Sequence, residues 1–532
     1  MRKIFILTLL IAGFLHAQVD TAWVRRYHGT GNTSDYATAL AIDNQGNVYV
    51  TGYSNGSGSD LDYATVKYNS AGVQQWVARY NGIGNYQDRA DAIAVDTQGN
   101  VYVTGHCASS TYNMDYVTIK YNSNGDTLWV RRYDGPGNDA DDAYAIAVDT
   151  SGNVYVTGQS YGSGTLWDYA TIKYNSAGAQ QWVARYNNSA FNDHDIAYAL
   201  ALDGQGNVYV TGRSNGTSGA SDIVTIKYNS AGIQQWLTSF SGPGDNYDWA
   251  KAIAVDSSGI VYVTGTSSDY NGVYDYITLK YNLVGTQLWA ARYNGPANSF
   301  DEAYAVKVDN SGNVYVTGYS GDVGSGSDFA TIKYNSLGVQ QWVERYNGPA
   351  NLDDGAYAMA IDMPGNIYVT GYSKSSSTSP DYLTIKYNSA GAQQWSARYN
   401  GPANNQDFAR AIAVDSQSRV YVTGESYNAG TFYDYTTIKY VQSGAIEEIK
   451  SCKLSVDNFS VFPNPAKTFF NVRSSLLAFP SSLKLFDVSG KQVKSKELSV
   501  KNCRVSLDGI KNGVYFVRVN GVMVKEKLVV TK

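Results

Sequence analysis

The stretch AIAVDTQGNVYVTG, at Ala92–Gly105, decides the fold of this 532-residue chain. It alternates small and branched apolar residues up to Asp96, and Gly99 and Asn100 then stand where a tight turn needs them. A second alternating run follows, so the pattern predicts two antiparallel strands joined by a hairpin. The motif Val-Tyr-Val-Thr-Gly, once with Ile first, recurs eight times and ends at Gly52, Gly105, Gly158, Gly212, Gly265, Gly318, Gly371 and Gly424.

The repeat contains two further strand patterns. The spacing between motifs is 53 residues, once 54, and a fixed period of this length is typical of propellers, solenoids and arrays. No stretch shows a sustained helical period, which argues against a β/α solenoid. Four antiparallel strands linked by hairpins form the blade of a β-propeller. In this repeat they are predicted at Ala92–Asp96, Val101–Thr104, Tyr116–Tyr121 and Leu128–Tyr133.

The order of the strands predicts how the ring closes. The fourth strand of each repeat carries a Trp, and Trp23 precedes the first innermost strand, whereas the last repeat ends with its third strand at Tyr435–Tyr440. We therefore expect an all-β, eight-bladed propeller over residues 18–440, in which Ala22–Tyr27 completes the eighth blade and covers its open edge. The eight tryptophans are Trp23, Trp76, Trp129, Trp182, Trp236, Trp289, Trp342 and Trp395.

The repeat resembles a known family. The unit DxAxAIAVDxxGNVYVTG, followed by DYATIKYNSAGxQQWxARYNGP, is similar to the bacterial SBBP-type β-propeller repeat. The resemblance covers nearly all of residues 22–440 with almost constant spacing. It implies a propeller and no particular activity.

The end of the chain has a different composition. Residues 441–453 are predicted to be a linker and residues 454–532 a small Ig-like β-sandwich. The segments Phe459–Ala466, Leu483–Lys491, Gly513–Val519 and Lys525–Lys532 resemble, in the same order, the type A C-terminal sorting domain of type IX secretion substrates. The resemblance implies recognition by the type IX machinery, passage across the outer membrane, and commonly removal of the domain with attachment to surface lipopolysaccharide. An ordinary Ig-like stalk is the alternative.

The start of the chain predicts export. Arg2 and Lys3 precede the apolar run Ile4–Leu15, and the small residue Ala17 precedes Gln18, so residues 1–17 are predicted to be a cleaved signal peptide. The apolar run is too short for a stable membrane anchor, and no other stretch is a transmembrane candidate.

Charge and cysteine content narrow the partners. The formal net charge is -5, so no basic face for nucleic acid is expected. The three cysteines Cys107, Cys452 and Cys503 form no repeated disulfide framework, and a Cys452–Cys503 disulfide in the tail is left as an alternative. We expect a monomer.

The lengths of the connections predict where a ligand binds. Short turns lie at one end of the blades, and the longer loops, such as Tyr53–Leu61 and Asn81–Arg89, lie together at the other end, called here the long-loop face. Binding residues concentrate on loops held by a rigid scaffold. The loop at 187–198 carries an inserted residue, and there His194 and Asp193 form a candidate ligand site. The other candidate ligand-binding residues are Tyr53, Tyr86, Tyr112, Tyr161, Tyr247 and Tyr270.

A ring of carboxylates is the candidate metal site. One Asp recurs at the entry to every innermost strand, near the channel, and hard oxygen ligands of this kind suit Ca²⁺. The alternative, which we favour, is that each carboxylate caps backbone N–H groups of its own loop. No other cofactor is expected. The eight residues are Asp35, Asp88, Asp141, Asp195, Asp248, Asp301, Asp354 and Asp407.

Three functions remain open from the sequence. The export signal, the sorting tail and the Tyr-, Asn- and Ser-rich loops favour a surface-displayed binding, adhesion or structural module for a glycan or a protein. The segment Asn69–Trp76 is similar to the Gly…Trp blade motif of quinoprotein dehydrogenases, but no adjacent cysteine pair accompanies it. A passive surface or matrix component is the third. Near-identical loops argue against catalysis, because an active site needs different groups at one point.

Overall fold

The computed structural model describes most of the chain. It covers residues 19–109, 113–216, 220–244, 246–324, 326–375 and 379–442, and, in the tail, residues 460–462, 469–473, 481–487, 491–498, 502–507, 510–519, 522–523 and 528–530. The predicted signal peptide, Tyr112 and Cys452, and with Cys452 the predicted disulfide, lie outside these residues. The chain separates into two compact units, Met1–Ser443 and Gly444–Lys532. No described segment is a helix with the length and apolar character that a membrane crossing requires.

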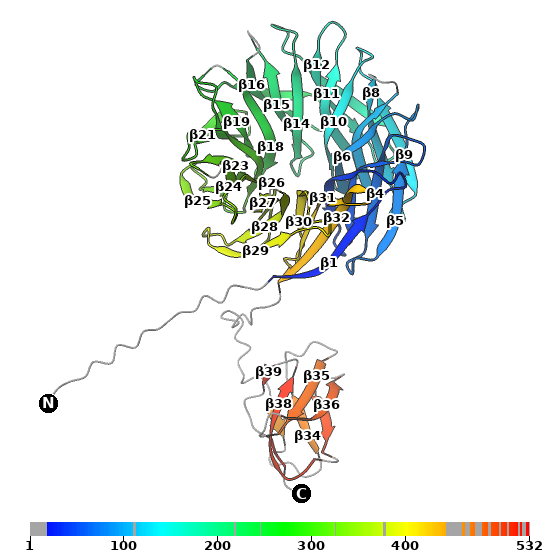
Figure 1. The fold of residues 1–532 in the computed structure, drawn as a ribbon, viewed down its shortest axis with the longest axis vertical. Helices are drawn as coiled ribbons and strands as arrows, with labels where there is room; N and C mark the ends of the chain where they lie inside the picture. The colour runs from blue at the N-terminus through cyan, green and yellow to red at the C-terminus, as the bar shows by residue number, and fades with distance from the viewer. Residues whose placement is uncertain are drawn as a thin grey trace, which may run out of the picture. The chain divides into compact units, whose positions relative to one another are not determined.

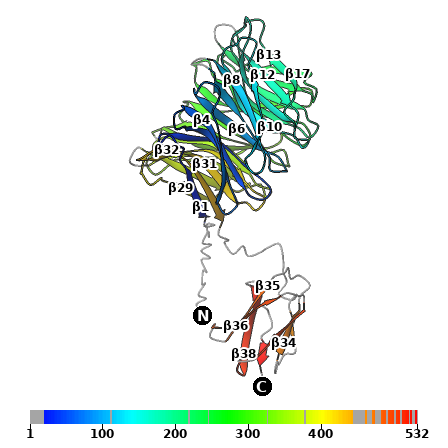
Figure 2. The ribbon, with the colours of Figure 1, turned by 90° about the vertical axis from the view of Figure 1, so that its right-hand side faces the viewer.

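The first unit is a ring of eight four-stranded antiparallel sheets, shown in Figures 1 and 2. This confirms the predicted eight-bladed propeller. The strands of blades 1 to 4 are β2 (Asp35–Ile42), β3 (Val48–Asn55), β4 (Leu61–Tyr68) and β5 (Gln74–Tyr80); β6 (Asp88–Val95), β7 (Val101–Ala108), β8 (Met114–Tyr121) and β9 (Thr127–Tyr133); β10 (Asp141–Val148), β11 (Val154–Tyr161), β12 (Trp167–Tyr174) and β13 (Gln180–Tyr186); β14 (Asp195–Leu202), β15 (Val208–Asn215), β16 (Ser221–Tyr228) and β17 (Gln234–Phe240).

The remaining blades follow the same order, except that the last is completed by the first strand of the chain. They consist of β18 (Asp248–Val255), β19 (Val261–Ser268), β20 (Tyr274–Tyr281) and β21 (Gln287–Tyr293); β22 (Asp301–Val308), β23 (Val314–Asp322), β24 (Gly326–Tyr334) and β25 (Gln340–Tyr346); β26 (Asp354–Ile361), β27 (Ile367–Lys374), β28 (Pro380–Tyr387) and β29 (Gln393–Tyr399); β30 (Asp407–Val414), β31 (Val420–Asn428), β32 (Phe432–Gln442) and β1 (Val19–Tyr27).

Strand β1 closes the ring by pairing antiparallel with β32, from Val19 opposite Gln442 to Tyr27 opposite Tyr435. Strand β1 thereby completes blade 8, which packs against blade 1. The junction between blades 8 and 1 is called here the seam, and it has the same contacts as the junction between two other neighbouring blades. The Tyr435 hydroxyl donates to the Ala64 carbonyl at 3.1 Å, as the Tyr63 hydroxyl donates to Val117 one blade later. The predicted closure by the N-terminal strand is therefore confirmed.

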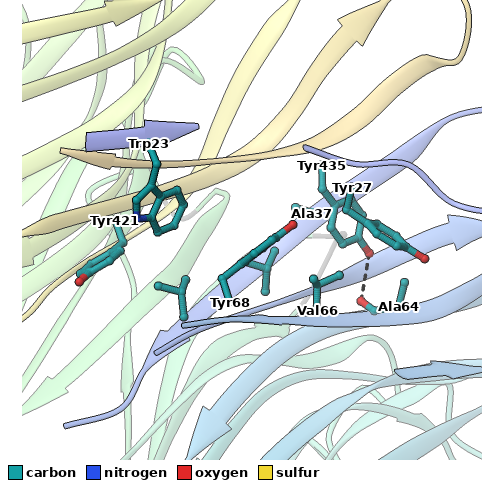
Figure 3. Close-up of a cluster of buried hydrophobic side chains, with 10 residues drawn as sticks. Trp23, Tyr27, Ala37, Ala64, Val66, Tyr68, Tyr421 and Tyr435 are labelled. Atoms are coloured by element: carbon teal, nitrogen blue, oxygen red, sulfur yellow. Dashed lines mark hydrogen bonds between the residues drawn. The ribbon is translucent and has the colours of Figure 1, made fainter. Parts of the chain in front are cut away.

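Aromatic packing fills the seam (Figure 3). The Trp23 side chain is 7% exposed, and its ring centroid lies 6.1 Å from that of Tyr68 and 6.3 Å from that of Tyr421. Tyr27 packs on Tyr435 in the same cluster. Burial of large aromatic side chains is the main favourable contribution at such a junction.

The strands are longer than the sequence predicts. Strand β6 begins at Asp88 rather than Ala92, and β7 continues to Ala108 rather than ending at Thr104. The reason is a β-bulge in every innermost strand: Ala90 pairs with Gly105 and Ala92 with Thr104, which leaves the residue between them unpaired. The bulge interrupts the alternation of apolar and polar residues, so the sequence pattern does not identify the segment before it as part of the strand.

The glycine that ends each repeated motif allows this bulge. A Cβ atom at Gly105 would lie 1.9 Å from the Arg89 carbonyl oxygen, and the equivalent glycines approach the bulged strand as closely. Only glycine therefore fits opposite the bulge.

The tail unit contains two antiparallel sheets. One has the order β33 (Ser460–Phe462), β34 (Phe469–Arg473), β37 (Asn502–Ser506); the other has the order β36 (Gln492–Leu498), β35 (Ser481–Phe486), β38 (Gly513–Val519), β39 (Val522–Met523), with β40 (Leu528–Val530) also paired to β38. The unit is all-β as predicted, and its Ig-like assignment stays a prediction.

Candidate binding site at the mouth of the central channel

A cavity of about 930 Å³ opens among the innermost strands at the end that carries the long loops. We call it the channel mouth. Its walls come from blades 1, 2, 3, 6, 7 and 8 and include both aromatic and charged side chains. The lining residues are Tyr36, Ala37, Thr38, Tyr53, Arg89, Asp91, His106, Met114, Asp142, Tyr144, Tyr304, Tyr357, Arg410 and Glu425.

The bulge supplies much of this lining. In each innermost strand the unpaired residue lies between the two paired alanines, and a bulge of this kind re-aims a side chain. Six of these eight residues line the channel mouth. Unlike the alanines on either side they are not constant, being Tyr in four blades and four different residues in the others: Thr38, Asp91, Tyr144, Tyr198, Lys251, Tyr304, Tyr357 and Arg410.

A histidine lies between two carboxylates on one wall. The Nδ1 atom of His106 is 3.5 Å from Asp91 Oδ2 and 3.2 Å from Asp142 Oδ1. Burial alone would lower the pKa of His106, but the two carboxylates outweigh it and raise that pKa above its usual value. Asp142 also accepts a hydrogen bond from Gln159 Nε2 at 2.6 Å. His106 therefore offsets part of the negative charge of the two carboxylates.

A second charge pair lies on the wall formed by blade 8. Arg410 donates to Glu425 through both Nε, at 3.0 Å, and Nη2, at 2.5 Å. The same guanidinium stacks 5.1 Å from the centroid of Tyr357 and 5.2 Å from that of Phe408. Burial raises the pKa of Glu425, and Arg410 opposes this rise. A two-point ion pair of this kind holds its groups in fixed positions.

Aromatic rings form two arcs around the channel mouth. Tyr36 packs between Tyr53, at 5.1 Å, and Tyr433, at 5.4 Å between ring centroids. On the other side Tyr357 contacts Tyr304 and Tyr372, each at 5.6 Å. These rings are half-buried, so they are held in place and still reach solvent.

The eight candidate metal ligands are all fully buried at the start of the innermost strands. Each accepts a backbone hydrogen bond from the loop that precedes it: Gly29 N–H donates to Asp35 at 2.7 Å, and Gly135 N–H donates to Asp141 at 2.6 Å. These are the bonds that the capping alternative requires. Among the described residues, Asp35 and Asp141 each belong to a cluster of three potential ligands, but no such cluster contains two of the eight. Calcium binding stays a prediction.

The candidate ligand-binding residues are scattered over the long-loop face. Tyr53 lies within β3 and Tyr161 ends β11, so neither belongs to a loop. Tyr86, Tyr247 and Tyr270 are 40%, 39% and 81% exposed.

His194 is not free to move. Its ring stacks on Trp167 at 4.6 Å between centroids, and its Nε2 is 3.7 Å from Asp193 Oδ1. Of all the candidates, only Tyr53 lines the channel mouth.

Apart from Tyr53, sequence reasoning did not identify the charged and aromatic residues of the channel mouth, because it looked for repeated residues and for loops. The signal was present in the positions marked x in DxAxA, where an otherwise constant strand changes from Thr38 to Asp91 to Arg410. Positions that vary within an otherwise constant repeat are those where the blades can present different chemical groups.

Comparisons with known proteins agree with this architecture. The β-propeller repeat family (SBBP) matches residues 23–58, 75–106, 128–164, 181–219 and 394–430, and the secretion system C-terminal sorting domain family matches residues 460–531. An uncharacterized WD repeat-containing protein of Acanthamoeba polyphaga mimivirus is 22% identical over 459 residues, which cover 62% of this chain and 32% of that protein. The chain therefore spans about a third of the curated relative that it matches.

Solved structures are more distant. PorZ, a bacterial surface component of the type IX secretion system of Porphyromonas gingivalis, is 14% identical with a TM-score of 0.38, over 93% of this chain and 70% of that one. Polysaccharide lyase Uly1 is 13% identical with a TM-score of 0.41, over 68% of this chain and 92% of that one. Likenesses at this level carry no argument about activity. The family matches show that this chain contains β-propeller (SBBP) repeats within residues 23–430 and a C-terminal type IX secretion sorting domain, which indicates export and attachment at the cell surface.

Proposed function

We propose that the propeller is a surface-displayed glycan-binding module whose ligand lies in the channel mouth. The observation that carries this proposal is a cavity of about 930 Å³ lined by residues that differ between blades, on a scaffold whose other positions repeat. Ligand sites are typically concave, of a few hundred to about 1,000 Å³, with a few fixed polar groups among apolar and aromatic walls.

The chemistry of the walls suits a sugar. A pyranose ring presents C–H groups on its faces and hydroxyl groups around its edge. Tyr36 and Tyr357 offer half-buried aromatic faces for the first, and the Arg410–Glu425 pair offers fixed donors and acceptors for the second. A protein partner needs a broader contact area than one concavity provides.

The side-chain contacts of the channel mouth support ligand binding better than catalysis. The acid and base groups of the channel mouth are already paired with one another, His106 with Asp91 and Asp142, and Glu425 with Arg410. Among the described residues of the lining, these groups contact one another rather than facing a common point as a free acid and a free base.

A glycan array with the secreted protein, followed by calorimetry on the best ligand, tests the proposal. We expect Tyr36→Ala and Tyr357→Ala each to weaken binding by about tenfold, the equivalent of about 1.4 kcal/mol and within the range of one aromatic contact. Unchanged melting temperatures would show that the variants remain folded.

Tyr270→Ala is the matched control, because Tyr270 is an exposed aromatic residue of the same face outside the channel mouth. It should leave affinity unchanged. Loss of binding in Tyr270→Ala but not in the other two variants would move the ligand to the loops. Binding to matrix proteins with none to any glycan would refute the proposal.

A further inference from the structure

The carboxylates of the channel mouth are accompanied by cations. Asp91 and Asp142 both lie beside His106, whose pKa is raised, and Glu425 lies against Arg410. Arg89 also lines the cavity, so with His106 protonated the lining holds three carboxylates and three cations. Two further cations, Arg213 and Lys251, lie beside this lining.

Two of these cations share one indole ring. The Arg213 guanidinium and the Lys251 ammonium each lie 5.3 Å from the Trp249 centroid. Lys251 also lies 5.4 Å from the ring of Tyr198 and 6.0 Å from that of Tyr304, which lines the channel mouth. Among the described residues neither cation forms an ion pair with a carboxylate. Lys251 is half-buried in an aromatic enclosure at the edge of the cavity.

An anion beside Lys251 and Arg213 would stabilise the charged form of Lys251. Burial lowers the pKa of Lys251, Glu302 opposes this from outside ion-pair distance, and the charge of Arg213 lowers the pKa further. Like charges held together in a half-buried site destabilise one another, and an anion between them relieves the repulsion.

A third cation, Arg89, lines the cavity in blade 2, three blades away from Lys251. Arg89 stacks 4.9 Å from the Tyr53 centroid, and its polar contact within the described chain is a long one, 3.4 Å to Gln87 Oε1. Its Nε atom is buried and makes no hydrogen bond to any described residue. A guanidinium held flat on a ring with an unused donor is suited to a carboxylate or a sulfate.

We infer that the ligand of the channel mouth is an anionic saccharide, one that carries carboxylate or sulfate groups. One acidic group would lie against Lys251 and Arg213 and another against Arg89, with sugar rings on the tyrosines between them. This inference rests on the proposed function, since it specifies the chemistry of the same site. Charge-assisted hydrogen bonds in such a site are stronger than hydrogen bonds between neutral groups.

Polymers of matched backbone test the charge requirement. Dextran sulfate and polygalacturonate supply sulfate and carboxylate, and dextran is the neutral counterpart of the first. We expect the protein to bind at least one acidic polymer about tenfold or more tightly than dextran, and less tightly as ionic strength rises from about 0.05 to 0.5 M. The double variant Arg213→Gln/Lys251→Gln should lose that preference and keep its melting temperature.

Lys227→Gln is the matched control. Lys227 also lies over a tyrosine, 5.0 Å from the Tyr209 centroid, but near the short-turn end of its blade. It should bind the acidic polymer like the parent protein. Equal binding of dextran and dextran sulfate, or an unchanged preference in the double variant, overturns the inference. If a neutral glycan binds on the array, the proposed glycan-binding function still holds. If no glycan of either kind binds, the proposed function fails as well.

Discussion

At the scale of single residues, the unpaired position of the innermost strands supplies six of the fourteen residues that line the channel mouth. The bulged residue is Asp91 in blade 2, Lys251 in blade 5 and Arg410 in blade 8, although the alanines on either side of it are constant. The backbone hydrogen bonds of the blade do not depend on this side chain. The position can therefore change chemically without loss of the fold, whereas the glycine opposite the bulge cannot.

We expect Gly105→Ala to destabilise the propeller and to disturb the site. The new Cβ would lie 1.9 Å from the Arg89 carbonyl oxygen, which is backbone and cannot rotate away. Overpacking of this kind costs about 1–3 kcal/mol, and the displaced strand carries both Arg89 and Asp91. Denaturant unfolding measures the first effect, and the affinity for an array-selected glycan measures the second.

Gly204→Ala is the control for this substitution. A Cβ at Gly204 meets nothing within 4 Å, and the residue lies in a short turn between β14 and β15. Its free energy of unfolding should match that of the parent protein. Equal stability of the two alanine variants would show that the close approach at the bulge is not a constraint.

At the scale of elements, β1 is the strand with the greatest effect on the ring. It supplies Trp23 and Tyr27 to the seam and covers the edge of β32, from which Lys439 reaches across to donate to the Ser70 carbonyl at 2.7 Å. Without β1 the backbone groups of β32 would form an open sheet edge, which invites pairing with another chain.

Deletion of residues 19–28 should therefore lower the melting temperature and cause association of the protein. Loss of Trp23 alone removes a buried aromatic side chain, a change that typically costs about 3–5 kcal/mol. A synthetic peptide of residues 19–28, added in excess, should restore the melting temperature and the monomeric elution volume. A peptide with alanine at Trp23 and Tyr27 is the control and should restore neither. A deletion variant as stable as the parent would mean that the seam does not hold the ring.

At the scale of the whole molecule, the sequence period was sufficient for the architecture and insufficient for the site. Eight motifs and a leading Trp strand gave both the number of blades and their closure, because each repeat must bury its faces against its neighbours. The strand ends were missed where the bulge breaks alternation, between Ala90 and Ala92. The site was missed because its residues come from different blades: His106 of blade 2 meets Asp142 of blade 3, and Tyr36 of blade 1 meets Tyr433 of blade 8 once the ring is closed. No local spacing in the sequence records these contacts.

The ring also has a collective response to pH. Burial raises the pKa of all eight carboxyls at the starts of the innermost strands, to about 6 at Asp141, Asp195 and Asp248. A raised pKa means that the folded state binds protons more tightly than the unfolded chain. Their stabilising contribution is therefore complete below the unfolded value of 3.8 and is lost as pH rises through about 6.

The carboxyls of the short turns have the opposite effect on stability, because their protonation at lower pH destabilises the folded state. Burial alone would raise the pKa of Asp96, but hydrogen bonds from Asn100, Tyr102 and the Gln98 N–H outweigh burial and hold that pKa below 3.8. The stability that such turns provide is present above 3.8 and is lost as pH falls through the lower folded value. The two sets together place the most stable pH near 4, because the first set loses its contribution above that pH and the second set loses its contribution below it.

We therefore expect the melting temperature to rise as pH falls from 7.5 to 5 and to drop again below pH 4, as scanning calorimetry would measure. Asp141→Asn removes one titrating carboxyl of the first set while its side-chain oxygen can still accept from the Gly135 N–H, so this variant should gain less on acidification from pH 7.5 to 5. Asp96→Asn is the control from the second set and should keep the parent's gain over that interval. A melting temperature that falls steadily from pH 7.5 to 5 would contradict the expectation, because the buried carboxyls would then have to be ionised in the folded ring at little cost.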